Sequence, residues 1–190
     1  MIKKLFLLFF LMTITGLVFS QDRQQKKWTL SGGYGLGNVW VYFLRHNSLI
    51  KDLPDYKISS YGPVTLTVEH FISPRISVGL TGAYSLVQGE SQRFLLDEQI
   101  SITSIMARGN YHFGKSKKLD PYAGVGLGYI RSVYRASLSL PGSVPGEFGY
   151  SAQLGASYLF LPKWAVFAEI GYVNGSLLQL GFSKIFHHCN

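Results

Sequence analysis

Three charged residues are the best candidates for chemistry in this chain. Glu69, Arg108 and Glu169 each lie in a segment where apolar residues alternate with small or polar ones, and each falls on the polar side. A buried charge is very costly unless an opposite charge and hydrogen bonds compensate it. We therefore expect the three side chains to meet as an ion-paired cluster inside the fold. The cluster would serve as a structural network, which we favour, or as a plug or gate.

Nucleophilic catalysis has weaker support in the sequence. A reactive serine needs a neighbouring base, and that base needs a third group to orient it. Of the five histidines, His112 is the one expected to face the interior, at the end of the fold that carries short turns. No serine–histidine spacing is diagnostic of such a site. We therefore expect no enzymatic activity.

Metal and nucleotide sites are not indicated either. His187, His188 and Cys189 have metal-binding side chains, but three adjacent residues of a tail seldom converge on one ion. The alternate glycines that begin at Gly124 do not fit the G-x-G-x-x-G phosphate loop, and no helix is expected after them. We expect neither a metal nor a cofactor.

The segments that must position these residues alternate with a period of two, which is typical of β-strands. In one of them, for example, Val78 and Leu80 alternate with Ser77 and Gly79. Eight such segments are found, at about 28–40, 61–72, 76–86, 100–113, 121–134, 148–160, 164–173 and 176–186. They predict an all-β fold, an eight-stranded antiparallel up-and-down transmembrane β-barrel.

The connections between these segments alternate in length. Long polar joins are expected near 41–60, 87–99 and 132–147, and short ones at 73–75, 114–120 and 161–163. Long loops on one side and tight turns on the other are typical of membrane barrels. The last join, Asn174-Gly175, is short and favours a type I′ hairpin turn.

The first long join is the best candidate for an interaction surface. Binding residues commonly lie on loops that a rigid scaffold positions. The join and its end mix charged and aromatic residues, namely His46, Lys51, Asp55, Tyr56, Lys57 and Tyr61. A loop that merely shields the mouth of the barrel remains the alternative.

Two features place the apolar face of the barrel outside, toward lipid. The other face is mostly Gly, Ser, Ala and Thr, which fits a narrow interior better than a charged soluble exterior. Aromatic residues gather at both ends of the strands, as in the girdles of membrane barrels. They are Trp28, Tyr111, Phe113, Phe160, Trp164 and Phe186 at one end, and Tyr34, Trp40, Tyr84, Tyr129, Tyr150 and Tyr172 at the other. A soluble lipocalin-like binding barrel is the alternative.

The N-terminus is typical of an export signal. Lys3 and Lys4 precede an apolar run over residues 5–19, and Ser20 ends it. We expect residues 1–20 to be a cleavable signal peptide and residues 21–190 to be the barrel domain, in the cell outer membrane. Cleavage would lower the formal charge from +8 to +6, because the two lysines are lost (8 − 2).

Composition excludes two further classes. The cations are scattered and do not form one stripe, so we expect no nucleic-acid partner. Cys189 is the single cysteine, which rules out an internal disulfide.

Three segments resemble the OmpA/OmpX-like (PorT-like) outer membrane β-barrel domain family. They are residues 73–80 (SPRISVGL), 121–129 (PYAGVGLGY) and 180–186 (LGFSKIF). Members of that family are structural proteins, adhesins, narrow channels and secretion accessories, so the resemblance implies the fold and little about activity. We expect a monomer among outer membrane lipids, assembled by the β-barrel assembly machinery, with an extracellular or envelope protein as a partner. The function that we expect is a non-enzymatic structural or loop-mediated interaction role, or alternatively a narrow, porin-like channel. The chain departs from the usual pattern in the four residues that follow Phe186.

Overall fold

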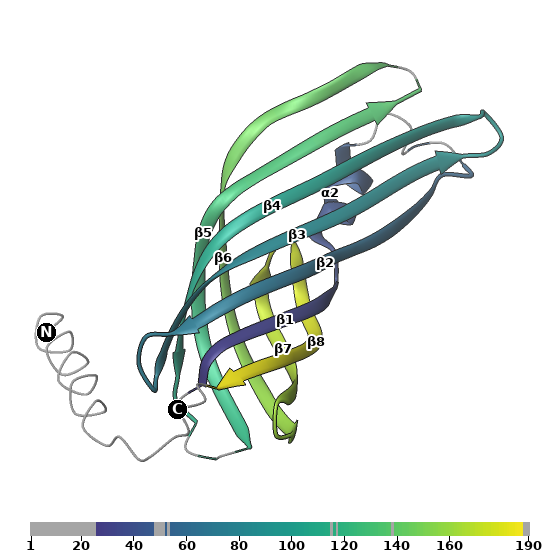
Figure 1. Ribbon diagram of the computed structural model, residues 1–190. Coiled ribbons are helices and arrows are strands. Elements are labelled where there is room, and N and C mark those ends of the chain that lie inside the picture. Colours follow the sequence, from purple (N-terminus) through teal and green to yellow (C-terminus); the bar gives the residue numbers. More distant parts are fainter. Residues whose placement is uncertain are drawn as a thin grey trace, which may run out of the picture.

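The chain folds into a closed barrel in which each strand pairs with its sequence neighbours and β1 pairs with β8 (Figure 1). The structure is a computed structural model that describes residues 26–47, 52, 54–114, 116, 118–137 and 139–187. Its strands are β1 (Lys26–Leu36), β2 (Lys57–Phe71), β3 (Ile76–Ser91), β4 (Leu96–His112), β5 (Leu119–Ala136), β6 (Ser139–Leu161), β7 (Trp164–Val173) and β8 (Ser176–His187), with one helix, α2 (Val39–Asn47). The predicted eight-stranded antiparallel barrel is confirmed. The predicted signal segment, residues 1–20, lies outside the described residues.

Part of the barrel has the apolar exterior that the sequence predicted. Between the short turns and the tyrosine level of Tyr84 and Tyr129, most outward side chains are aliphatic or aromatic, and Leu80, Ile105 and Val125 are about 60% exposed (61%, 62% and 65%). The ten residue steps from Ile76 to Leu86 rise roughly 25 Å at a tilt of about 40°, the height of a membrane-barrel apolar band. We call this part the belt half.

The other part is longer than predicted. The expected loops 87–99 and 132–147 are wrong, because both are mostly strand. Gln88 pairs with Gln99 in one hairpin, which turns at residues 92–95, and Ser132 pairs with Val144 in the next. Figure 1 shows both hairpins rising well beyond the upper ends of β7 and β8. We call residues 57–60, 87–91, 96–102 and 131–136 the projecting wall.

The inward face is buried in both parts, but it is mainly polar in the belt half and mainly apolar in the projecting wall. In the belt half of β4, polar Arg108 and Asn110 point inward and Ile105 points outward. In the projecting wall of the same strand, Ile100 and Ile102 are buried, while Gln99 on the alternate face is less covered. The period-two alternation therefore continues, but the apolar and polar faces exchange places. This exchange made residues 87–99 look like a loop in the sequence.

Helix α2 replaces the end of the predicted first strand, which stops at Leu36. Asn38 caps the helix, since its Oδ1 accepts from the Trp40 amide (3.0 Å) and its Nδ2 donates to Ser85 Oγ (2.7 Å). The Val39 amide donates to the Gly175 carbonyl (2.9 Å), which ties the helix to the β7–β8 turn. Trp40 was predicted in the aromatic girdle, but it packs beside the interior cluster instead.

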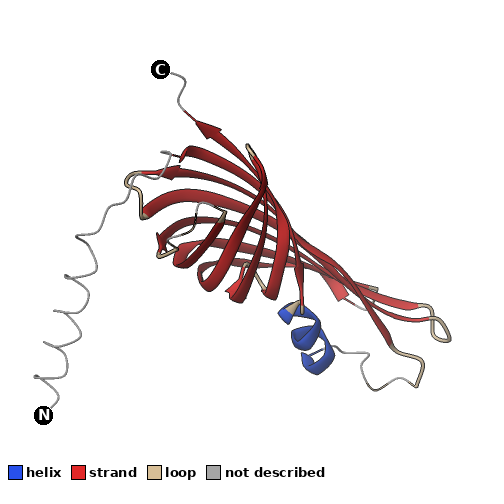
Figure 2. Ribbon diagram, turned by 90° about the horizontal axis from the view of Figure 1, so that it is seen from below, coloured by secondary structure: helices blue, strands red, loops and turns tan. Residues whose placement is uncertain are grey.

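The cluster beneath the helix is a small hydrophobic core. Leu44, on the buried face of α2, packs with Val87, Ile100 and Ile102 of the projecting wall. The helix lies against the inner side of that wall, at the end of the barrel where the long hairpins project (Figure 2). No helix in the described part of the chain has the length and apolar character to cross a membrane.

The β7–β8 connection matches its prediction. Asn174 and Gly175 both have positive φ (50° and 88°), as a type I′ hairpin requires. The turn is buried beneath α2, because a Cβ at Gly175 would lie 2.6 Å from the Trp40 indole nitrogen. A glycine is therefore required there for two reasons, backbone conformation and space.

Candidate functional site

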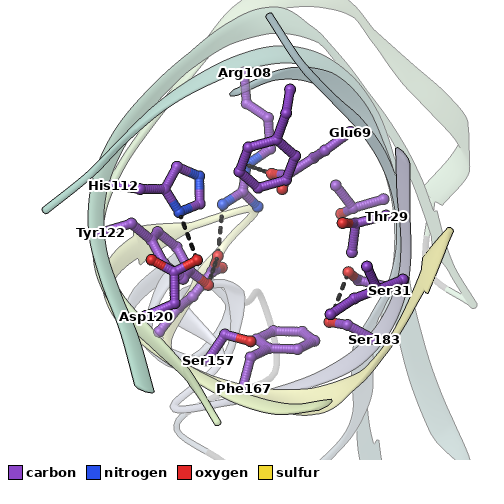
Figure 3. A pocket seen from close by; sticks show the side chains of 14 residues that line it. Thr29, Ser31, Glu69, Arg108, His112, Asp120, Tyr122, Ser157, Phe167 and Ser183 are labelled. Atoms are coloured by element: carbon purple, nitrogen blue, oxygen red, sulfur yellow. Dashed lines mark hydrogen bonds and ion pairs between the residues drawn. The ribbon is translucent and has the colours of Figure 1, made fainter. Parts of the chain in front are cut away.

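The three predicted charges meet in the lumen. Arg108 of β4 lies between Glu69 of β2 and Glu169 of β7. Figure 3 shows Arg108 and Glu69 reaching toward each other in the lumen. Its Nη2 donates to Glu169 Oε1 at 2.5 Å, and its Nε lies 3.1 Å from Glu69 Oε1. Arg108 and Glu169 are almost fully buried, at 7% and 2% exposure. The cluster joins three strands that are far apart in sequence.

Polar neighbours extend this cluster around the lumen. Asn110 Nδ2 donates to Glu69 Oε1 (2.6 Å), and the Tyr122 hydroxyl donates to Glu169 Oε1 (2.8 Å). Gln153 Nε2 donates in turn to Asn110 Oδ1 (3.2 Å). Hydrogen bonds of this kind reduce the cost of burying charges, because they replace the water that each group loses. We call this set, with the three charges, the luminal network.

A small cavity adjoins the luminal network. It has a volume of about 40 Å³, and its lining includes Thr29, Ser31, Phe167 and Ser183 besides the charged residues (Figure 3). A water molecule needs about 10–15 Å³ of such space, so the cavity has room for roughly three. Glu169 Oε2, which has no hydrogen-bond partner among the protein groups described, belongs to a residue that borders it.

A second polar chain lies near the short turns. His112 Nε2 lies 3.0 Å from Ser77 Oγ, and His112 Nδ1 lies 3.1 Å from Asp120 Oδ2. This is the order of contacts found in Ser-His-Asp hydrolases. However, Ser77 is fully buried (0% exposed) and does not border the cavity, so no substrate carbonyl has access to its hydroxyl. The rings of Phe71 and Tyr122 flank His112, at 4.8 and 5.3 Å between centroids.

The contacts between Ser77, His112 and Asp120 were not predicted from the sequence, because Asp120 was assigned to a turn. Asp120 was assigned to the turn over residues 114–120, whereas it is the second residue of β5 and points inward. Ser77 comes close to His112 because β3 and β4 pair with Ser77 opposite Asn110, two residues away. Inward positions on adjacent strands at the same height would have been the available signal.

A further buried carboxylate lies in the projecting wall. Glu98 is 2% exposed, and the hydroxyls of Tyr56 and Tyr134 donate to its two oxygens at 2.8 and 2.7 Å. Sequence reasoning missed Glu98 because it placed residues 87–99 in a loop.

The predicted interaction loop is not a single surface, which corrects that expectation. His46 lies in α2, where its Nδ1 is 2.9 Å from the Tyr42 carbonyl, and Lys51 lies outside the described residues. Lys57 and Tyr61 belong to β2, and Tyr61 packs edge-on against Tyr34 with 6.1 Å between ring centroids.

Asp55 and Tyr56, the remaining residues of the predicted interaction loop, bind to the inner side of the projecting wall. We call this pair the strap. Asp55 accepts hydrogen bonds from Ser91 Oγ and the Arg93 amide, both at 2.6 Å. These bonds hold the pKa of Asp55 below its usual value, because they stabilise the charged form. Tyr56 contacts Gly89, where a Cβ would lie 2.4 Å from its hydroxyl, and donates to Glu98.

The closed barrel, its apolar belt and its polar lumen together define an integral membrane β-barrel. A family model described as "Outer membrane protein beta-barrel domain" matches residues 6–184. The chain therefore belongs to this outer membrane β-barrel family, as the sequence resemblance predicted. The soluble lipocalin-like alternative is not favoured, because the apolar face of the belt half points outward.

Solved structures of small outer membrane barrels are similar to this chain. Outer Membrane Protein W of E. coli has a TM-score of 0.49 and 16% identity, covering 87% of this chain and 100% of that one. The Ail protein of Yersinia pestis has a TM-score of 0.48 and 13% identity (85% and 95% covered), and the N-terminal barrel of Pseudomonas aeruginosa OprF has 0.47 and 15% (85% and 98% covered). No curated protein sequence matches the chain.

Proposed function

We propose that this protein is a non-enzymatic, non-conducting outer membrane barrel that uses its projecting wall to bind an extracellular or envelope protein partner. The observation that carries the proposal is the division of the barrel into a sealed lumen and a wall that extends beyond the belt. In this proposal residues 1–20 direct export and are removed, and the projecting wall faces the cell exterior.

Closure of the lumen at two levels supports a role other than transport. The luminal network joins β2, β4 and β7 across the belt half, and α2 above it packs on the projecting wall and is bonded to the β7–β8 turn. Eight-stranded barrels have interiors that side chains fill. A narrow channel is the competing function, and it requires both closures to open.

The tip of the β3–β4 hairpin is the best candidate contact. Phe94 and Leu95 are 48% and 88% exposed, and the Arg93 guanidinium lies 5.9 Å from the Phe94 ring centroid. Exposed apolar groups at the end of a projecting hairpin commonly mark an interaction site. The outward face of the wall beside the tip carries the charged residues Glu90 and Asp97, which keep it soluble.

Two measurements test the proposal. Purified protein in planar bilayers should give no conductance, and stable openings of the wild type would contradict it. Cells that display Phe94→Ser/Leu95→Ser should lose adhesion to surfaces that wild-type cells bind, with Gln88→Ser as the matched control on the same hairpin. Equal adhesion of all three would exclude the tip as the contact.

The absence of enzymatic activity has its own test. We expect a fluorophosphonate probe to leave Ser77 unlabelled in the folded barrel, because this side chain is fully buried. Labelling that disappears in Ser77→Ala would instead favour a hydrolase.

A further inference from the structure

A groove runs across the outer, lipid-facing surface of the barrel. It has a volume of about 990 Å³ and spans β8, β1, β2, β3 and β4. Its floor includes Gly32 and Gly82, and a Cβ placed at either glycine would have no atom within 4 Å. The groove therefore exists because two outward positions lack side chains.

The strand register divides the groove into two depressions, one at Gly32 and one at Gly82. Gly32 pairs with Leu66, and Leu66 pairs with Gly82, so a bulky residue stands between two glycines. Phe182 beside Gly32 and Ile105 beside Gly82 form the outer walls. The two depressions lie roughly 9.6 Å apart, twice the strand spacing of about 4.8 Å.

Tyrosines border the upper end of the groove. Tyr34, Tyr61 and Tyr84 all line it, and all three are exposed. The Tyr34 hydroxyl accepts from the Gly62 amide at 3.1 Å, which fixes that ring in place. Amphipathic rings prefer the headgroup level of a membrane, so the groove lies just below it.

Arg131 lies on the outer surface in the same row as Tyr84, two strands away. Tyr84 pairs with Thr103, and Thr103 pairs with Arg131 on β5, so the three lie in one row on the outer surface. Arg131 is exposed, and within the described part of the chain no ion pair is found for it. Its guanidinium is therefore available for a phosphate, for which arginine has suitable geometry.

We infer that this groove and Arg131 form a binding site for one lipid A molecule, a phosphorylated lipid with several acyl chains. Two chains lie in the depressions on either side of Leu66, and a phosphate lies against Arg131. Lipid A fits better than a phospholipid, because the chains of a phospholipid lie side by side and not on opposite sides of Leu66. The inference rests on the proposed orientation, in which the tyrosine end faces the outer leaflet.

Native mass spectrometry of the purified barrel with diphosphorylated, hexa-acylated lipid A tests the site. Gly32→Leu/Gly82→Leu places side chains in the depressions, with no atom within 4 Å of either new Cβ, and we expect it to weaken lipid A binding about tenfold. Gly109→Leu is the matched control, since it adds the same side chain to the lipid face outside the groove, with its nearest atom at 4.0 Å. The heat-modifiable mobility of each variant checks that the barrel has folded.

The phosphate contact has a separate readout. Arg131→Gln should weaken binding of diphosphorylated lipid A by a similar factor, whereas Arg135→Gln on the same strand should not. The effect of Arg131→Gln should disappear with dephosphorylated lipid A, while that of the filled groove remains.

Four outcomes would overturn the inference. They are equal binding by all variants, equal loss in Gly109→Leu, equal affinity for phosphatidylglycerol, and a dimer that the filled groove abolishes. Labelling of a cysteine at the hairpin tip by an impermeant maleimide on intact cells checks the orientation separately. Failure of the orientation would thus be distinguished from failure of the site.

Discussion

The belt half and the projecting wall consist of the same strands, yet they are held together by different forces. In the belt half the exterior contacts lipid, so the apolar residues face outward and the interior holds the luminal network. In the projecting wall the exterior contacts water, so the interior holds the Leu44 cluster and α2 covers it. The surrounding solvent therefore determines which kind of side chain faces inward, while the inward face and the backbone pairing are continuous through both regions.

This difference predicts where each region is vulnerable. A network of charges fails when one member is removed, because the others remain buried without compensation. A small apolar core fails gradually, as contacts and buried area are lost.

The largest effect is expected from Arg108→Ala. It leaves buried Glu169 and largely covered Glu69 without their cation, and we expect the free energy of unfolding to fall by about 3–5 kcal/mol. Urea unfolding in lipid vesicles would measure this change. The control is Arg135→Ala on the outer face of the wall, expected within about 0.5 kcal/mol of wild type. Equal losses in both variants would contradict the central role of the luminal network.

A lysine scan along one face of β4 tests the boundary between the regions. Ala107→Lys, beside Leu80 in the middle of the belt half, puts a charge against lipid and should cost about 2–4 kcal/mol, as is typical near the bilayer midplane. Gln99→Lys, on the same outward face but in the projecting wall, should change stability by less than about 0.5 kcal/mol. A large cost at Gln99 would place the membrane boundary higher than we infer.

Leu44→Ala should weaken the projecting wall alone. We expect a loss of about 2–3 kcal/mol in the docking of α2, since a fully buried leucine leaves a cavity when it is truncated. Hydrogen exchange of the α2 amides should accelerate, while that of the belt half stays unchanged. Tyr42→Ala, on the exposed side of the same helix, is the control. Acceleration throughout the barrel would show that the two regions unfold together.

The smallest effect concerns acid and the strap at Asp55. The pKa of Asp55 is lower in the folded state, so its contribution is present above the unfolded pKa of about 3.9 and is lost as pH falls through the folded pKa. We expect the Arg93 amide to lose protection from hydrogen exchange over that acidic range. Asp55→Asn should remove the pH dependence, and a dependence that persists in this variant would assign it to another group.

The two regions were also unequally predictable. In the belt half, alternation at positions such as Val78 and Ser77 identified the strands, and burial cost brought Glu69, Arg108 and Glu169 into one expected cluster. In the projecting wall the same alternation over residues 87–99 was taken for a loop. The apolar-outward pattern that had identified the other strands is reversed there.

What the sequence by itself determined is the strand period, the number of strands and the polarity of the belt half. These are local properties, since each follows from residues one or two positions apart. Only the tertiary structure decided that Asp120 and Ser77 reach His112, that Tyr56 and Tyr134 reach Glu98, and that Asn38 begins a helix over the mouth. Those contacts depend on the register between neighbouring strands and on the closure of the barrel. The register and the closure each depend on many weak strand pairings formed together, so they cannot be inferred from any short segment of the sequence.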